Sequence, residues 1–225
     1  MKRLVITQEV RNAFPGLKSA MITVKGVKSE RKNHKLEEIR GRIIKEIKKK
    51  YSLESLKDVA IFRAYRNFYW RLGIDPTKTR PASEALIRRV LRSGSIPSIN
   101  GAVDACNLAS METGISLSAL DEGKVVGDLS IRFAFEGEVF FGVGMKKPIE
   151  LKGDEIVIAD EEGAVGIYPY RDSDRTKITN DTRDVIYISC GVPGIDEELL
   201  LKAVRKAAEY LIEVCGGEVE GELLV

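Results

Sequence analysis

Residues 97–133 read PSINGAVDACNLASMETGISLSALDEGKVVGDLSIRF, and they set the fold class. The first part, Gly101 to Thr113, is small and mostly apolar and contains no proline. Gly114 follows it, so we predict a buried helix that ends at this glycine. The second part changes to short β-rich runs separated by turn residues, which predicts strands such as Leu129 to Phe133. A helix followed by a set of short strands is typical of an α+β domain.

Upstream of this stretch the sequence predicts mainly helices. Apolar residues recur at helical spacing from Leu36 to Tyr51, and a second helix is expected from about Leu56 to Leu72. Two prolines bracket Asp75 to Pro81, which excludes a helix there. Ser83 is placed to cap the next helix. A short strand is expected from Ala20 to Val24.

Downstream, glycine turns separate further strands, and a last helix follows. The strands are expected at residues 139–142, 156–159, 165–168 and 185–189. Asp196 is expected to cap the last helix, and Gly216 and Gly217 stop it. We therefore predict one α+β domain over residues 1–225, with helices packed on a curved sheet or small barrel. It comprises a helical part at 1–96, a β-rich part at 97–189 and a closing helix within 196–215.

Composition excludes several kinds of protein. No apolar run approaches the ~20 residues that span a bilayer, and Met1 to Phe14 lacks the apolar core of a signal peptide. We expect a cytoplasmic protein. The three cysteines are far apart and His34 is the only histidine, so we predict neither a zinc site nor a histidine-based triad. We predict no metal and no cofactor.

The net charge of +2 conceals an uneven distribution. Residues 25–50 carry eleven Lys or Arg against four Glu, and residues 61–100 carry eight against two acids. Residues 184–225 carry nine acids against three bases. Basic surfaces of this size can hold a polyanion, but solvated helix faces with internal ion pairs give the same pattern. Charge alone leaves both readings open.

Two polar groups of residues point to a site. Asn100, Asp104 and Asn107 recur at helical spacing on one face of the apolar helix. Asp and Asn are mediocre helix formers, so we favour a wet pocket over a solvent face. The second group is the polar loop from Tyr170 to Lys177, where acids and bases alternate after a strand. A surface loop with local ion pairs would look the same.

An ordered series of short segments carries a family resemblance. The segments are Ser98 to Asn107, Ser118 to Asp121, Val126 to Arg132, Glu136 to Glu138, Ile156 to Asp160 and Thr179 to Thr182. This series resembles the editing domain of the phenylalanyl-tRNA synthetase beta subunit, formed there by its third and fourth modules. The segments Tyr65 to Tyr69 and Gly73 to Glu84 resemble freestanding relatives of that domain.

The resemblance implies a pocket within residues 72–182 that receives the 3′ end of a misacylated tRNA. In the family, the ester is hydrolysed and wrongly attached tyrosine is released, which requires an oriented water and donors for the oxyanion. The family's editing glutamate falls on Asp174, its histidine on Ser118 and a frequent arginine on Pro97. Direct matches are Asp104, Asn107, Gly127 and Arg132.

As a hypothesis, we assign roles to matched residues and to further polar and basic residues near them. The expected catalytic residues are Asp174, Asn107 and Asp104. The expected substrate-binding residues are Asn100, Ser118, Gly127, Thr77, Thr79 and Ser83. The expected tRNA-binding residues are Arg63, Arg66, Lys78 and Arg80, although an ordinary exposed surface explains each of these four side chains equally well.

Three readings of the function remain open. The first is a deacylase acting in trans on misacylated aminoacyl-tRNA. The second is a non-catalytic module that binds tRNA or an amino acid, and the third is a scaffold for a protein partner. We expect tRNA or aminoacyl-tRNA as the partner, with no DNA and no membrane. A homo-oligomer is also possible, but the sequence contains no heptad repeat that would mark its interface. Asp75 and Glu84 could instead pair with Arg80 or Arg88 and fix the loop between them.

Overall fold

The computed structural model describes residues 1–28 and 34–225. In these ranges the α-helices are α1 Gln8–Ala13, α2 His34–Lys50, α3 Ala60–Arg71, α4 Ala82–Ser93, α5 Gly101–Thr113 and α6 Glu197–Cys215. Two short 3-10 helices are η1 Ser55–Asp58 and η2 Glu122–Lys124. The strands are β1 Leu4–Ile6, β2 Ala20–Lys25, β3 Leu117–Asp121, β4 Leu129–Phe133, β5 Val139–Phe140, β6 Ile149–Glu150, β7 Ile156–Asp160, β8 Gly163–Ile167, β9 Arg171–Asp172, β10 Val185–Ser189 and β11 Glu218–Leu224.

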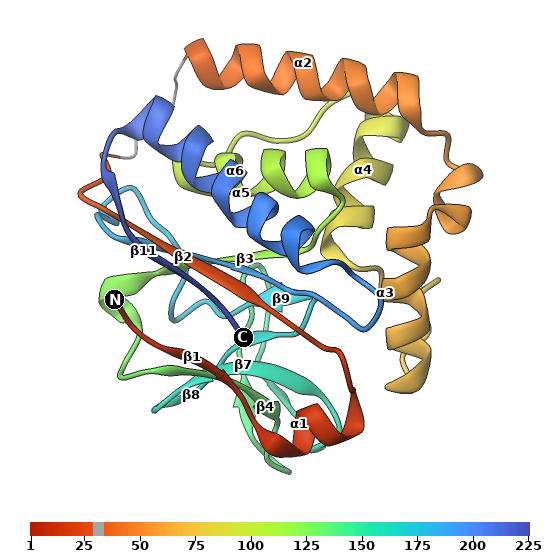
Figure 1. The fold of residues 1–225 in the computed structure, drawn as a ribbon, viewed down its shortest axis with the longest axis vertical. Coiled ribbons are helices and arrows are strands. Elements are labelled where there is room, and N and C mark those ends of the chain that lie inside the picture. Colours follow the sequence, from red (N-terminus) through yellow and green to blue (C-terminus); the bar gives the residue numbers. More distant parts are fainter. Residues whose placement is uncertain (29–33) are drawn as a thin grey trace.

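The elements form a helical layer and two stacked sheets (Figure 1). One sheet has the order β11-β2-β10-β3, and the second has the order β1-β4-β7-β8-β9. Helices α5 and α6 lie on one face of the first sheet, with α2 and α4 beyond them, and the second sheet lies under its other face. Strands β5 and β6 form a separate two-stranded ladder, and Phe140 of β5 packs against Val157 and Ala164 of the second sheet.

The first sheet is buried on both faces because its strands alternate in the direction of their side chains. On β2, Ile22 packs into the core that contains the helices, while Met21 packs into the core between the sheets. On β10, Tyr187 points to the helices, while Ile186 and Ile188 point to the second sheet. These strands therefore read as continuous apolar runs in the sequence.

The structure confirms the α+β class, with open sheets in place of a barrel. Among the described residues, each sheet runs from one edge strand to another and none closes on itself. The expected helices at residues 36–51 and 101–113 and the strands at 129–133 and 185–189 are present. Gly114 ends α5 in the left-handed region at φ 77°. The side chain of Asp196 accepts the hydrogen bond that caps α6.

Several elements differ from the sequence-based expectations. The helix expected from Leu56 to Leu72 is interrupted at Val59, whose backbone is extended (φ −69°, ψ 126°) between η1 and α3. Ser83 does not cap α4: Pro81 occupies that position, and Ser83 is buried inside the helix. Two segments for which no strand was predicted form β1 and β11, which add edge strands to the two sheets.

Candidate functional site

The carboxylate of Asp172 lies where β9 of one sheet meets β3 of the other. The hydroxyl of Ser118 donates a hydrogen bond to Oδ1 of Asp172. The backbone N–H of Ala119 donates to Oδ2 at 3.1 Å. Gly166 on β8 leaves this corner open, since a Cβ there would lie 3.4 Å from Oδ1. Two strands and a glycine therefore hold one half-buried carboxylate in a fixed position.

The environment of Asp172 changes its protonation. Burial raises the pKa of its carboxyl to about 6, although the hydrogen bonds from Ser118 and Ala119 act in the opposite direction. The buried thiols of Cys106 and Cys190 add to the apolar surroundings, and burial raises the pKa of both well above the usual value. A carboxyl with a pKa near 6 accepts protons more readily than an ordinary aspartate and is still largely ionised at pH 7.

Asp174 lines a neighbouring cavity of about 520 Å³. Its backbone N–H donates to the carbonyl of Phe141 at 2.9 Å, and Nζ of Lys177 lies 2.7 Å from Oδ1. The other walls of this cavity are Glu138, Val139, Phe141, Glu162, Gly163, Ala164, Ser173 and Arg175. The family-matched pair Ser118 and Asp174 is not joined, because Ser118 bonds to Asp172 instead.

The polar stripe of α5 is largely engaged in holding the helix. Asp104 is fully buried and accepts from Arg40 on α2 and from the hydroxyl of Ser98, both at 2.6 Å. Asn100 is the N-cap, and its side chain accepts from the N–H of Val103 at 3.0 Å. Asn107 is half-buried and forms no side-chain hydrogen bond with a described residue. A catalytic role for Asp104, Asn107 or Asp174 stays a prediction.

The loop at Gly127 is fixed by charges on the second sheet. Gly127 has φ +67°, and a Cβ there would meet the side chain of Glu161. Next to it, the N–H of Val126 donates to Asp160 at 2.9 Å, and Asp160 also holds Arg175 through Nη2 at 2.6 Å. Burial raises the pKa of Asp160, but these hydrogen bonds outweigh burial and leave it lowered. A substrate contact at Gly127 stays a prediction.

The residues expected at the pocket rim are mostly tied to local structure. Thr77 is exposed, and both its N–H and its hydroxyl bond to Oδ1 of Asp75, at 2.8 and 2.7 Å. The N–H of Thr79 bonds to the carbonyl of Asp75 at 3.0 Å. Ser83 is fully buried, and its hydroxyl lies 3.2 Å from that of Ser116. Binding roles for the two threonines and Ser83 stay predictions.

The four residues expected to bind tRNA fall into two groups. Arg66 is engaged by the buried Glu84 through two hydrogen bonds of 2.9 and 2.6 Å. Arg63 is exposed on α3. Lys78 and Arg80 lie together beside helix α4, where they line a pocket with residues of that helix. The structure therefore brings two of the four into one cavity.

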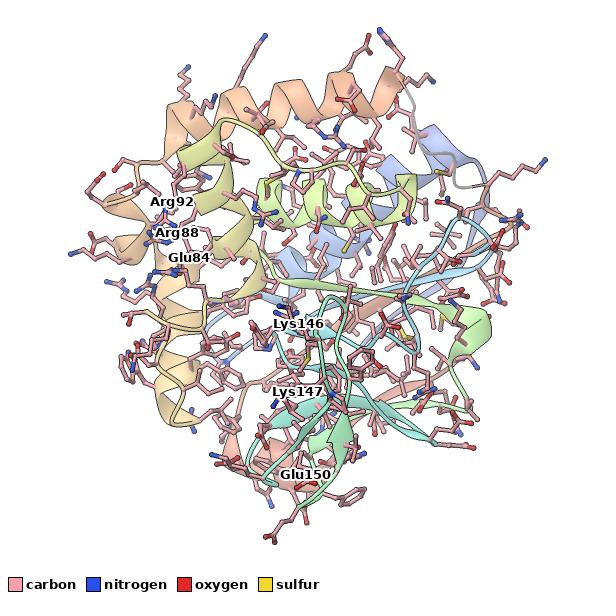
Figure 2. The ribbon with its side chains drawn as sticks, turned by 180° about the vertical axis from the view of Figure 1, so that it is seen from behind. Glu84, Arg88, Arg92, Lys146, Lys147 and Glu150 are labelled. Atoms are coloured by element: carbon pink, nitrogen blue, oxygen red, sulfur yellow. The ribbon has the colours of Figure 1, made fainter. Side chains whose placement is uncertain are left out.

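Glu84 makes the ion pair that was left open from the sequence. It is fully buried on α4 and also accepts from Nε of Arg88 at 2.6 Å. Figure 2 shows Glu84, Arg88 and Arg92 along this helix. Burial raises the pKa of Glu84, but the hydrogen bonds from Arg66 and Arg88 outweigh it and leave the pKa lowered.

Sequence reasoning missed Asp172 and the arginines of α4. The polar loop that contains Asp172 was recognised, but family matching placed weight on Asp174, two residues further along. The arginines of α4 were counted in the positive charge of residues 61–100 without being assigned to a face. Their spacing at positions 88, 89 and 92 is the signal that would have found that face.

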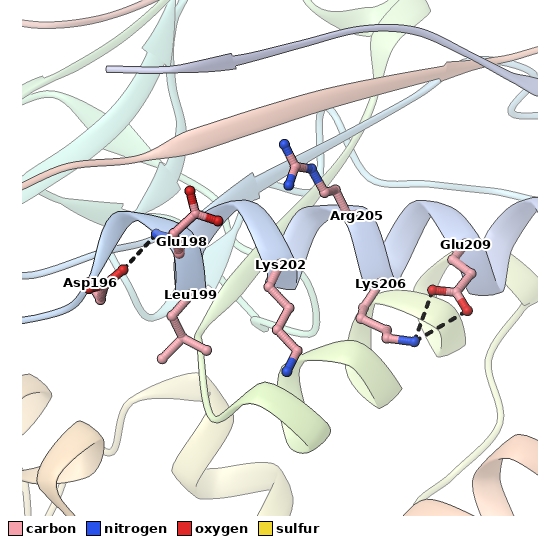
Figure 3. A pocket seen from close by; sticks show the side chains of 7 residues that line it. All are labelled: Asp196, Glu198, Leu199, Lys202, Arg205, Lys206 and Glu209. Carbon is pink, nitrogen blue, oxygen red and sulfur yellow. Dashed lines mark hydrogen bonds and ion pairs between the residues drawn. The ribbon is translucent and has the colours of Figure 1, made fainter.

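A shallow groove runs along α6 (Figure 3), and it is lined by Asp196, Glu198, Leu199, Lys202, Arg205, Lys206 and Glu209. Oδ1 of Asp196 accepts from the N–H of Glu198 at 2.8 Å, and Lys206 pairs with Glu209 at 2.9 Å. Arg205 is bound by Glu222 of β11 at 2.6 Å. Acids and bases alternate here and largely neutralise one another, so this groove has no marked preference for a charged ligand.

The described residues offer neither a cluster of metal ligands nor a membrane-spanning helix. Residues 1–28 and 34–225 contain no group of three His, Cys, Asp or Glu side chains placed to hold a metal ion. No helix within those ranges has the length and apolar character needed to cross a membrane.

The fold is similar to that of a solved aminoacyl-tRNA synthetase fragment. This is an N-terminal fragment of the phenylalanyl-tRNA synthetase beta subunit from Pyrococcus horikoshii. The two structures match with a TM-score of 0.50 and 14% sequence identity, over 99% of this chain and 53% of the other. At this identity the match concerns the fold alone.

Sequence comparison identifies the family. The family model of the B3/4 domain matches residues 64–216, and the chain belongs to this family. It is 28% identical over 163 residues to the phenylalanine–tRNA ligase beta subunit of Pseudomonas savastanoi, covering 62% of this chain and 20% of that protein. It is 28% identical over 153 residues to that of Vibrio parahaemolyticus, covering 57% and 19%. The chain thus aligns with about a fifth of the length of these relatives.

Proposed function

We propose that the protein is a deacylase that acts in trans on misacylated tRNA in the cytoplasm. The observation that carries this proposal is the Asp172 carboxyl, held by Ser118 and Ala119, with its pKa raised to about 6. Ser118 stands where the family resemblance places a histidine. Asp172, at the same corner of the fold as Ser118, can thus accept a proton from water at neutral pH in place of that histidine.

The proposed reaction is hydrolysis of the ester between an amino acid and the terminal ribose. Asp172 accepts a proton as the water oxygen bonds to the carbonyl carbon. The bond from that carbon to the ribose oxygen then breaks, and the proton passes to the ribose oxygen. Asp174 binds the α-amino group, and Asn107 donates to the developing oxyanion. The products are free amino acid and tRNA.

The second candidate is a binding module without catalysis, which retains the pocket. Pro97 and Ser118 replace the arginine and histidine of the family pattern, and this favours the second candidate. Both candidates predict tRNA binding, but only the first predicts that the ester is cleaved. A homo-oligomer is compatible with either candidate.

Mischarged tRNAs bearing different amino acids test the first candidate. The protein, an Asp172→Asn variant and an Asp174→Ala variant are each incubated with these tRNAs, and remaining ester is measured over time. We expect the wild type to clear at least one ester faster than buffer does. Loss of general base catalysis at Asp172 should slow clearance roughly 100-fold or more.

A matched control removes a surface carboxylate that the proposed reaction does not use. Asp128 pairs with Arg3 at 2.7 Å on the surface, so Asp128→Asn should leave the rate unchanged. If the wild type clears no ester faster than buffer, the deacylase is wrong and the binding module stands. If Asp172→Asn and Asp128→Asn are equally active, the role given to Asp172 is wrong.

A further inference from the structure

Helix α4 exposes a basic face. Arg92 lies four residues after Arg88 and three after Arg89, so the three side chains project from the same side of the helix. The opposite side carries Ile87 and Val90, which are fully buried. Ala85 lies on the same side of the helix, one turn nearer the N-terminus, and its small side chain does not fill the cavity.

This face forms one wall of a cavity of about 390 Å³, which we call the α4 basic pocket. The loop after α3 supplies Lys78 and Arg80, and Tyr170 comes from the chain just before β9. The charged and aromatic residues that line it are Lys78, Arg80, Arg88, Arg89, Arg92 and Tyr170. Two separate segments therefore direct five cationic side chains to one cavity, and a third segment adds an aromatic ring.

No acidic side chain among the described residues lines this pocket. Arg88 is held by Glu84, and Lys78 lies 4.0 Å from Asp75. Arg80, Arg89 and Arg92 form no ion pair with any residue in the ranges 1–28 and 34–225. The arrangement contrasts with the α6 groove, where basic side chains have acidic neighbours (Figure 3).

Two features argue against an ordinary solvated helix face. The Nε of Arg80 is buried and has no hydrogen-bond partner among the described residues, and an unsatisfied buried donor costs about 1–3 kcal/mol. The helix dipole favours a cation in the last turn of α4, which accounts for Arg92. It does not account for Lys78 and Arg80, which come from outside the helix. A bound anion would offset the repulsion among the five cations of the pocket and supply a hydrogen-bond acceptor for Arg80.

We propose that the α4 basic pocket binds phosphate groups of the single-stranded 3′ end of tRNA. Arginine guanidinium groups match the geometry of phosphate oxygens, and several of them track a backbone. Tyr170 is 38% exposed, and the guanidinium of Arg171 lies over its ring at 4.9 Å from the centroid. A base would stack on the opposite face of this ring.

The location of the pocket supports the same ligand. Asp172 lies two residues after Tyr170, which is roughly 7 Å along an extended chain. An RNA strand held in the pocket would therefore end next to Asp172, the proposed proton acceptor. This inference rests on the proposed function for the identity of its RNA.

Binding of uncharged tRNA tests the pocket without any reaction. The affinity of the wild type and of an Arg89→Ala/Arg92→Ala variant is measured over a range of salt concentrations. Both side chains are exposed, and alanine favours helix, so α4 should persist, which circular dichroism would verify. Each contact to single-stranded phosphate contributes about 0.7 to the salt slope. At about 0.1 M salt that is ~5-fold in affinity per contact, so we expect a ~25-fold loss and a slope lower by about 1.4.

The matched control removes two unpaired cations from another helix. Lys45 and Lys49 are exposed one turn apart on α2, so Lys45→Ala/Lys49→Ala gives the same change in net charge. We expect this variant to bind tRNA as the wild type does. An equal loss of affinity in both variants would show diffuse attraction and overturn the pocket.

A second arm identifies the part of the RNA. Removing the single-stranded 3′ nucleotides from tRNA should weaken binding to the wild type and have little further effect on the Arg89→Ala/Arg92→Ala variant. If the truncated tRNA binds the wild type unchanged, the ligand assignment is wrong. If the wild type cleaves the ester but Arg89→Ala/Arg92→Ala binds tRNA as tightly as the wild type, the pocket alone is overturned. Pocket-dependent binding without cleavage would overturn the deacylase alone.

Discussion

Replacing Asp172 by asparagine should raise the free energy of unfolding at neutral pH. Burial raises the pKa of this carboxyl to about 6, against about 3.9 for an unperturbed aspartate. The folded state therefore disfavours the carboxylate. The stabilising contribution of the protonated form is fully present below about pH 4 and is lost as the pH rises through about 6. Asparagine resembles the protonated side chain and cannot ionise, so the variant keeps this contribution.

The magnitude follows from the difference between the two pKa values. About two units at ~1.4 kcal/mol each give an upper limit of about 3 kcal/mol, which applies above pH 7. The residue is only half-buried, so we expect about 1–3 kcal/mol. The amide can donate to the oxygen of Ser118 and accept from the N–H of Ala119, so both contacts of Asp172 are retained.

Urea unfolding of the wild type and the variant between pH 4 and pH 8 measures this difference. The two free energies should be similar at pH 4, separate mainly between pH 4 and pH 6, and stay about 1–3 kcal/mol apart at higher pH. The melting temperature of the variant should be higher by about 2–9 °C at pH 8. In the control Asp128→Asn, a carboxylate whose pKa is lowered by its bonds to Arg3 is lost, so its stability should fall at neutral pH. A pH-independent difference for Asp172→Asn would refute the reasoning.

Three further outcomes are expected. Asp104→Ala should lower the free energy of unfolding by about 3–5 kcal/mol in urea at pH 7, because it leaves Arg40 without its buried partner; a loss below ~1 kcal/mol would contradict this. Glu84 has a lowered pKa, so its contribution is present above about pH 4.3 and is lost in acid; Glu84→Gln should be less stable than the wild type at pH 7 by about 2–4 kcal/mol and closer to it at pH 3. Burial raises the pKa of Cys106 and Cys190, so a thiol reagent should modify both at least ~100-fold more slowly in the folded protein than in urea, and equally fast labelling would contradict their burial.

Local sequence was a good guide wherever a single segment carries the signal. The helix from Gly101 to Thr113, its glycine end and the aspartate cap of α6 depend on neighbouring residues, and all three appear as expected. The prediction was wrong where distant contacts compete with local preference. Ser83 is a good cap residue by type, but it is buried inside the helix, where its hydroxyl forms a hydrogen bond with that of Ser116.

The edge strands β1 and β11 show the same limit. Each is stabilised by pairing with a strand far away in the sequence, β1 with β4 and β11 with β2. No pattern within the short segment Leu4–Ile6 distinguishes a strand from a loop, because hydrogen bonds to the partner supply the stability.

The sequence alone indicated the α+β class, the ordered family segments and a polar loop of alternating charge from Tyr170 to Lys177. It could not indicate that burial would raise the pKa of Asp172. Asp172 and Asp174 have the same side chain and differ by two positions, but Asp172 meets β3 at the junction of two sheets and Asp174 faces a cavity beside Lys177. Desolvation depends on the atoms that surround a group, and the chain places those atoms only when residues 118, 166 and 172 come together in the fold.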